Sequence, residues 1–241
     1  MTQASEGRRL VLATANPHKV AELAAIVRAA GLPLEVTSAR ALGPAPEIPE
    51  DLGSFVAHAT LKARGVAAWL RGRGEAGRTL VLADDSGLCV DALGGAPGVD
   101  SALYAGRQGD DAGNNAKLQR ELLARGLERS PAHYVCVLAL TRVDEAPLPA
   151  VAGATRGEDE VLLFEARWEG EVRVAPRGVG GFGYDPHFWP RGSEASVAEL
   201  PAALKNAASH RGQATASLLA GLPALLAGAQ GGSGRGGEKS G

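Results

Sequence analysis

Asp84, Asp85 and Ser86 are the residues whose types and spacing most strongly favour chemistry, and they follow the apolar run 80–83 directly. That run shows no alternation of apolar and polar residues, which is typical of a strand covered on both faces in a parallel sheet. Ligands of open α/β sheets bind beyond the carboxyl ends of the strands, and carboxylate oxygens are ligands that Mg²⁺ prefers. We therefore expect a hard cation and a phosphate to meet these two carboxylates. The alternative is a solvated turn, because Asp, Ser and Gly are common turn residues.

A second polar segment, residues 14–19, lies between an apolar strand at 10–13 and a helix with an apolar face. Asn16 suits the N-cap position of this helix and Pro17 its first turn. The free N–H groups at a helix N-terminus favour an anion. Lys19 in the first turn opposes the helix dipole, so a phosphate explains it better than helix stability does. The alternative is an ordinary capped helix, and the glycine spacing of a Walker A loop is missing.

The remaining pattern predicts alternating strands and helices. A helix capped by Ser54 is expected to run to about Leu70, another follows Asp110 and Asp111, and a last one begins near Ser209. Strands are expected at residues 34–37, 134–143, 161–168 and 171–174, the last two pairing as a hairpin around Glu169-Gly170, and 147–159 is expected to be a loop.

Composition limits the class of protein. The 241 residues can form one domain or two at most, with 45% hydrophobic and 22% charged residues. A net charge of −2 argues against broad electrostatic binding of nucleic acid. Cys89 and Cys136 lie in apolar runs and are interpreted as buried thiols of a reducing cytoplasm. Because no signal segment or membrane-length apolar run is found, we expect a cytoplasmic protein without membrane contact.

Four polar segments interrupt the apolar elements, at residues 14–19, 84–87, 181–186 and 205–211. Together they resemble the inosine/xanthosine triphosphate pyrophosphatase family. Its members hydrolyse non-standard purine nucleoside triphosphates (ITP, dITP, XTP) to the monophosphate and pyrophosphate. The likeness runs from about Leu10 to Leu226. The matching pieces, in order, are residues 12–16 with Lys19, Phe55 with 61–63, 83–88, 95–99, 104–106, 181–186, and Lys205 with 209–212.

The resemblance implies an α/β fold with an elongated, mixed, twisted sheet, flanking helices and two lobes around a central nucleotide cleft. It also implies a homodimer, Mg²⁺ as cofactor and a purine nucleoside triphosphate as substrate. We expect one pyrophosphatase domain over residues 8–227, followed by a Gly- and Ser-rich tail, 228–241, that is disordered.

Site residues follow from the same resemblance. Asp85 would be the catalytic general base and a Mg²⁺ ligand, with Glu50 as the second metal carboxylate and Asp51 as its alternative. The substrate would contact Thr14, Ala15, Asn16, Pro17, His18, Lys19 and Ser86, with Thr14, Asn16 and Lys19 around the phosphates. The nucleoside would contact Phe182, Gly183, Tyr184, Asp185, His210 and Arg211, with Lys205 at the base or at a phosphate.

This chain also departs from the family pattern. His18 stands where Gly is usual, Ala57-His58-Ala59 replaces Glu-Asn-Ala, and Leu103 replaces an Arg. One alternative function is therefore a catalytically weak nucleotide-binding or sensing module, although retention of Asp84 and Asp85 argues against it. A nucleic-acid-binding domain is disfavoured by the charge and by the aromatic content of only 4%.

Overall fold

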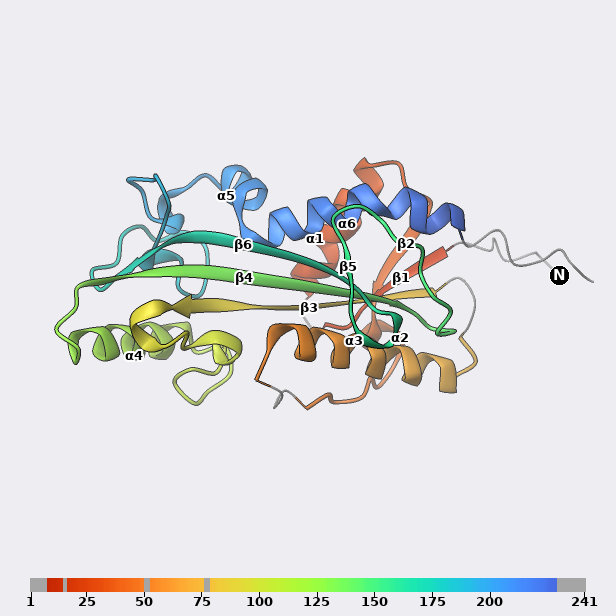
Figure 1. Cartoon of the computed structure of the whole chain (residues 1–241), viewed down its shortest axis with the longest axis horizontal. Helices are drawn as coiled ribbons and strands as arrows, with labels where there is room; N and C mark the ends of the chain where they lie inside the picture. Colours follow the sequence, from red (N-terminus) through yellow and green to blue (C-terminus); the bar gives the residue numbers. More distant parts are fainter. Residues whose placement is uncertain (1–7, 15–16, 50–52, 76–78, 229–241) are drawn as a thin grey trace, which may run out of the picture.

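The computed structural model describes residues 8–14, 17–49, 53–75 and 79–228 (Figure 1). Its strands are β1 (Arg8–Leu12), β2 (Leu34–Ser38), β3 (Thr79–Val90), β4 (Arg129–Arg142), β5 (Thr155–Arg156), β6 (Leu162–Arg173) and β7 (Phe188–Pro190). Its α-helices are α1 (Pro17–Ala29), α2 (Ala39–Leu42), α3 (Phe55–Gly72), α4 (Asp111–Leu123), α5 (Ala202–Ala208) and α6 (His210–Gly228).

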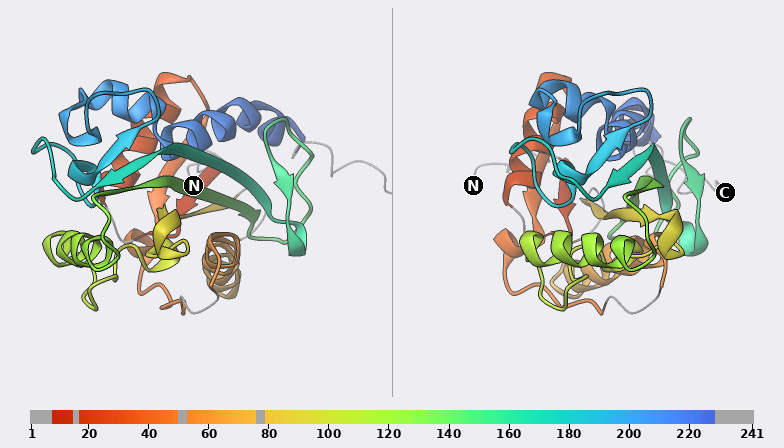
Figure 2. Two further views of the ribbon diagram at one scale, coloured as in Figure 1. Left: turned by 60° about the vertical axis from the view of Figure 1, so that its left-hand side comes forward. Right: turned by 90° about the vertical axis from the view of Figure 1, so that its left-hand side faces the viewer.

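In the described part of the chain, the seven strands form one mixed sheet in the order β2-β1-β3-β4-β6-β5, with β7 also pairing β6. β1 is parallel to both β2 and β3, whereas the remaining pairs are antiparallel. The strands β3, β4 and β6 have 12, 14 and 12 residues and run along the long axis of the molecule (Figures 1 and 2). The predicted elongated, mixed sheet with flanking helices is confirmed.

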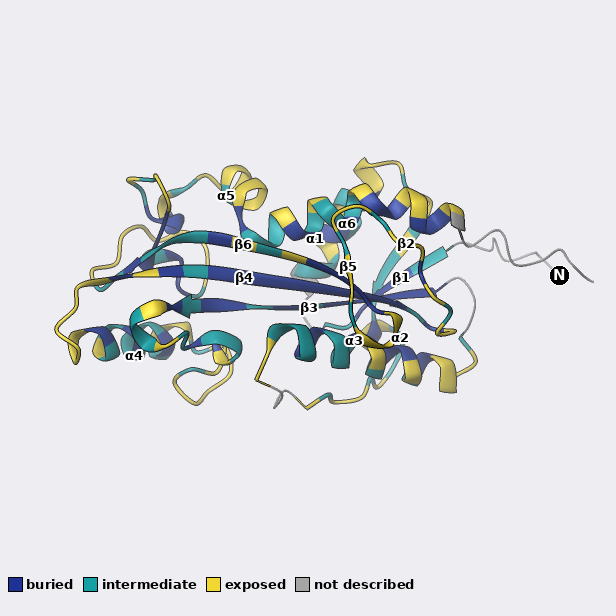
Figure 3. Cartoon of the chain, viewed as in Figure 1, coloured by how far each residue is buried: buried dark blue, intermediate teal, exposed yellow. Residues whose placement is uncertain are grey.

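Helices cover both faces of the long strands. On one face, α1 and α6 pack on leucines of the sheet such as Leu82 and Leu138. On the other, Ala59 and Ala63 of α3 pack against Ala83 and other small residues, and small side chains let the helix approach the strands closely. A separate cluster around α4, β7 and the far ends of β4 and β6 forms the core of a second lobe. The two lobes thus share the long strands, of which β3 and β4 are buried along most of their length, whereas β6 is partly exposed (Figure 3).

The helix starts that the sequence indicated are present. The Oγ of Ser54 accepts the N–H of Ala57 at 3.1 Å at the start of α3. The Oδ1 of Asp110 accepts the N–H of Gly113 at 2.9 Å at the start of α4. These caps satisfy N–H groups that a helix leaves free at its N-terminus.

The strand that contains the run 80–83 does not end at Ala83, so the alternative of a solvated turn at the acidic segment is wrong. β3 continues to Val90, because β4 pairs with it along its whole length and places Asp84 opposite Leu138. The parallel neighbour β1 does end here, with Leu12 opposite Leu82. The two carboxylates therefore lie just beyond the carboxyl end of β1, but on a continuous strand.

The predicted hairpin around Glu169-Gly170 is also wrong. β6 is one strand, and β4 pairs with it through this point, with Gly170 opposite Ala132. A Cβ at Gly170 would overlap the carbonyl oxygen of Trp189, so this glycine allows β7 to approach rather than making a turn. The expected loop 147–159 contains the short strand β5, and α5 was not anticipated.

Two further expectations concern the thiols and the chain end. Cys136 is buried as predicted, but Cys89 is only partly buried, and both are free thiols. The helix α6 ends at Gly228, and the rest of the predicted tail lies outside the described residues. In the described part of the chain, no helix combines the length and apolar character needed to cross a bilayer.

Candidate active site

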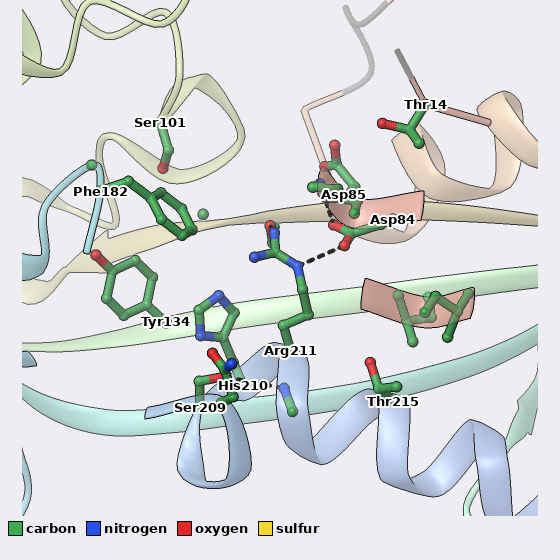
Figure 4. Close-up of a pocket in the computed structure, with 18 of the residues that line it drawn as sticks. Thr14, Asp84, Asp85, Ser101, Tyr134, Phe182, Ser209, His210, Arg211 and Thr215 are labelled. Atoms are coloured by element: carbon green, nitrogen blue, oxygen red, sulfur yellow. Dashed lines mark hydrogen bonds and ion pairs between the residues drawn. The ribbon is translucent and has the colours of Figure 1, made fainter. Parts of the chain in front are cut away.

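A cavity of about 740 Å³ lies between the lobes, lined by the end of β1, the start of α1, the middle of β3, the loop around Phe182 and the start of α6. Figure 4 shows that it has two chemically different ends. Asp84, Asp85 and Thr14 lie at one end, whereas Phe182, Tyr134 and His210 lie at the other, with Arg211 between them.

Asp84 is held by two cations from different helices. Its Oδ2 accepts a hydrogen bond from Nε of Arg211 at 2.8 Å, and its Oδ1 lies 3.3 Å from Nζ of Lys19. The Arg211 guanidinium also donates to Oγ of Ser86 at 2.9 Å. Burial acts to raise the pKa of Asp84, but the charges and hydrogen bonds of Lys19 and Arg211 outweigh it and hold this pKa well below its usual range. Asp84 therefore stays ionised and ties α1 and α6 to β3.

Asp85 points to the opposite side of β3, because consecutive strand residues alternate. It is buried, its Oδ1 accepts from Nζ of Lys62 at 2.8 Å, and its Oδ2 lies 3.5 Å from Nδ1 of His58. Lys62 and His58 are four residues apart on α3, so both face the strand. The carboxylate of Asp85 is thus held by two side chains of α3.

The donor set around Asp85 fits one mode of Mg²⁺ binding. Among the described residues, no three His, Cys, Asp or Glu side chains gather into a metal-binding group. Mg²⁺ is usually held by only one or two carboxylates, and completes its octahedral shell with waters and substrate phosphates. Asp85 at the edge of a cavity with room for a triphosphate suits that arrangement. Glu50 and its alternative Asp51 lie outside the described residues.

The expected phosphate segment is described only in part. Thr14 and Lys19 line the cavity. Ala15 and Asn16 lie outside the described residues, and for Pro17 and His18 only the backbone, at the start of α1, is described. The start of α1 therefore faces the same end of the cavity as the two aspartates.

The aromatic end is organised by the loop 181–185. Asp185 forms an ion pair with Lys205 and accepts the N–H of Phe182 at 2.8 Å. The Lys205 ammonium lies 4.2 Å from the centre of the Phe182 ring, which is 63% exposed. Gly181 has φ +78°, and a Cβ there would overlap the Asp185 carboxylate, so only glycine fits. Burial raises the pKa of Asp185 despite the Lys205 contact.

His210 lies flat against Tyr134, with ring centres 4.7 Å apart and an interplanar angle of 4°. Burial, with the nearby charge of Arg211, lowers the pKa of His210 to about 3, so the imidazole is neutral at pH 7. Its Nδ1 has no hydrogen-bond partner among the described residues. A neutral imidazole offers one donor and one acceptor to a ligand in the cavity.

Tyr184 and Arg211, two of the expected nucleoside contacts, form hydrogen bonds with other residues of the protein. The Tyr184 hydroxyl is buried and donates to the carbonyl of Ser101 at 2.8 Å. Arg211 lies on Asp84 and Ser86, between the two ends of the cavity, rather than beside Phe182. Lys205, which the sequence left open, lies at the aromatic end.

Sequence reasoning assigned no role to several residues that shape the cavity. Lys62 was included in the Leu61-Lys62-Ala63 match to the family, and His58 was noted as a departure from the family pattern. Tyr134 and Asp111 also line the cavity, but they became apparent only through strand and loop packing.

Known proteins resemble this chain in sequence and in fold. A "dITP/XTP pyrophosphatase" of Ralstonia nicotianae is 47% identical over 215 residues, 88% of this chain and 95% of the relative. One of the same name from Acinetobacter baumannii is 44% identical over 207 residues, 85% of this chain and 90% of the relative. A solved HAM1 protein from Coxiella burnetii superposes with a TM-score of 0.74 at 36% identity, covering 88% of this chain and 96% of that one. Since residues 10–221 also match the model of the Ham1 family, this chain belongs to that family.

Proposed function

We propose that this protein hydrolyses non-standard purine nucleoside triphosphates to the nucleoside monophosphate and pyrophosphate. The observation that carries the proposal is one cavity with a cation- and carboxylate-lined end and an aromatic end. This arrangement suits a molecule that is polyanionic at one end and a planar base at the other. The names of the curated relatives describe the same reaction class.

The polar end would bind and activate the triphosphate. Lys19, Thr14 and the N–H groups at the start of α1 would neutralise and orient the phosphates, because phosphoryl transfer depends mainly on charge neutralisation and alignment. Asp85 would accept the proton of the water that attacks phosphorus. Lys62 would keep its carboxylate correctly directed, given the 2.8 Å contact.

The family's reaction generally requires a divalent metal, and we propose Mg²⁺, held by Asp85 with Glu50 as the second carboxylate. When bound, the ion supplies charge neutralisation on the phosphate oxygens. The oxygen-only character of these side chains supports Mg²⁺ over softer metals.

The aromatic end would select the base. Phe182 would stack on the purine, and His210, Arg211 and Lys205 would offer hydrogen-bond donors near its edge. Inosine and xanthosine carry a 6-oxo acceptor, whereas adenosine carries a 6-amino donor that would leave such donors unpaired. A site built on hydrogen bonds discriminates by about 10⁴-fold on that basis.

A catalytically weak nucleotide sensor is the less favoured function. A site that had lost turnover would have no reason to keep Asp85 buried against Lys62. We also propose, from the family resemblance, a single domain over residues 8–227 that forms a homodimer. A cytoplasmic location would match the nucleotide pool on which such an enzyme acts.

Turnover of ITP, XTP, ATP and GTP, with and without Mg²⁺, tests the proposal. Phosphate release is followed with added inorganic pyrophosphatase. We expect kcat/KM for ITP and XTP far above that for ATP, and turnover only with the metal. Binding of ITP without release of pyrophosphate would favour the sensor instead, and equal hydrolysis of ITP and ATP would refute the base assignment.

A further inference from the structure

The first turns of α4 carry a repeated pattern of polar residues, Asp110-Asp111 and then Asn114-Asn115. Residues four apart on a helix lie on the same face, so the repeat forms two neighbouring pairs. The first pair is Asp110 with Asn114, and the second is Asp111 with Asn115. The first pair makes hydrogen bonds at the start of the helix and to the chain that precedes it. Asp110 caps the helix through Gly113, and Oδ1 of Asn114 accepts the N–H of Ala105 at 2.7 Å.

The second pair reaches a part of the chain about seventy residues away. The Oδ2 of Asp111 accepts the N–H of Gly183 at 2.7 Å, and Nδ2 of Asn115 donates to the carbonyl of the same glycine at 2.9 Å. Both polar backbone groups of Gly183 are therefore held by one helix face.

Gly183 directly follows Phe182, whose own N–H is held by Asp185 at 2.8 Å. The backbone on both sides of the aromatic residue is thus fixed, while its ring is 63% exposed and contacts the Lys205 ammonium. The backbone sets the direction of the Cα–Cβ bond from which the ring projects, and the Lys205 contact limits how the ring turns about that bond. Side chains that fix Gly183 consequently help to fix the ring.

We propose that Asp111 and Asn115 are positioning residues that hold the Phe182 ring in place for stacking on the base. The inference rests on the proposed function, since it needs a base at this end of the cavity. It assigns to the start of α4 a role in affinity for the nucleoside half of the substrate, and none toward the phosphates. Ordering the ring in advance removes part of the entropic cost of binding.

The chain supplies a matched control on the same helix face. Gln119 lies four residues beyond Asn115, and its Nε2 donates to the carbonyl of Val174 at 2.9 Å. It makes the same kind of bond at the same length as Asn115, but its partner is outside the loop 181–185. Gln119→Ala therefore reproduces the loss of one helix-to-backbone bond without releasing Gly183.

The test measures binding of the two products separately by calorimetry in Mg²⁺ buffer, with IMP as the nucleoside probe and pyrophosphate as the phosphate probe. For Asp111→Ala and Asn115→Asp we expect IMP affinity to fall about ten-fold, as loss of one hydrogen bond allows. Pyrophosphate affinity should stay within about two-fold by the same reasoning, because its contacts are at the other end. Asp111→Asn keeps an acceptor and should restore most of the IMP affinity.

The steady-state parameters supply a second readout. KM for ITP should rise in Asp111→Ala and Asn115→Asp while kcat changes little. If Gln119→Ala weakens IMP as much as Asn115→Asp does, or if IMP and pyrophosphate weaken together, the pair is merely structural and the proposal is overturned. Unchanged IMP affinity in a wild-type-like fold also overturns it while leaving the proposed function intact. If the wild type neither binds IMP nor hydrolyses ITP, the proposed function itself fails, and this inference fails with it.

Discussion

At the scale of single residues, Asp84 and Asp85 are neighbours in sequence with different surroundings, because strand residues alternate between faces. Asp84 is neutralised by Lys19 and Arg211, which favours a role in holding two helices together. Asp85 contacts Lys62 and His58 of α3 and lies at the edge of the cavity. Of the two, Asp85 is the better placed to take a proton from water.

Asp85→Asn should lower kcat for ITP by at least about 10³-fold, since a general base alone contributes about 10²–10⁴-fold and the same carboxylate is proposed to bind Mg²⁺. The measurement is initial-rate turnover at saturating ITP. Asp91→Asn is the control, because Asp91 is exposed and lies next to the end of the same strand. An Asp85→Asn enzyme that retains a tenth of wild-type turnover would exclude Asp85 as the base.

His210 should make the folded protein sensitive to acid. Burial, followed by the charge of Arg211, lowers the pKa of His210 to about 3, whereas histidine in an unfolded chain titrates near 6.5. Above pH 6.5 neither state binds the proton, so His210 has no effect on stability there. Below pH 6.5 the unfolded chain takes up a proton that the folded protein refuses, and stability is lost progressively as pH falls toward 3.

The melting temperature of His210→Gln should therefore fall less than that of the wild type between pH 7 and pH 5. Thermal unfolding followed by circular dichroism measures this slope. His133→Gln, a change in a half-buried histidine outside the cavity, is the comparison. Equal slopes for His210→Gln and the wild type would show that His210 is not kept neutral by the fold.

At the scale of elements, local sequence signals were sufficient to predict where helices α3 and α4 begin, but not where strands end. Ser54 was predicted as a cap, and a helix was predicted to follow Asp110, because capping acts within a single turn. The continuation of β3 through Asp84 depends instead on β4, which lies some fifty residues further along the chain. Polar residues and glycine suggest a turn unless a neighbouring strand supplies hydrogen bonds, and the sequence does not state which strands are neighbours.

The same limit applies to the candidate site. Residues of contiguous motifs, such as Asp85 and Lys19, could be selected from the sequence because their spacing matches a known pattern. Other contacts join segments some seventy residues apart. Tyr134 stacks on His210, and side chains of α4 form hydrogen bonds with Gly183. No local pattern encodes such contacts.

Gly170 gives a direct test of the close packing between β6 and β7. Gly170→Ala should destabilise the protein by about 1–3 kcal/mol, because the new Cβ would overlap the carbonyl oxygen of Trp189 and the Phe188 ring. Gly72→Ala is the matched substitution, since nothing lies within 4 Å of a Cβ there and its φ is not positive. It should be neutral or stabilise by up to about 1 kcal/mol. Urea unfolding of both variants distinguishes overpacking from a general cost of losing glycine.

At the scale of the whole molecule, the long shared strands place two binding environments in one cavity, and each environment is built from different residues. The phosphate end depends on β1, α1 and β3, whereas the base end depends on the loop 181–185 and the start of α6. A nucleoside triphosphate would bridge the lobes, and its two products would each occupy one end. We therefore expect IMP and pyrophosphate to bind at the same time.

In Mg²⁺ buffer, IMP and pyrophosphate should each raise the melting temperature, and together they should raise it by about the sum. A ligand present at about 100 times its Kd stabilises the folded state by about 2.7 kcal/mol, which is readily measured. Lys19→Met should abolish the pyrophosphate shift and keep the IMP shift, because it removes a cation from the polar end only. Phe182→Ala should do the reverse, because the ring is exposed at the base end and its loss leaves the core intact. Competition between the two products in the wild type, or loss of both shifts in either variant, would show that the cavity acts as one undivided site.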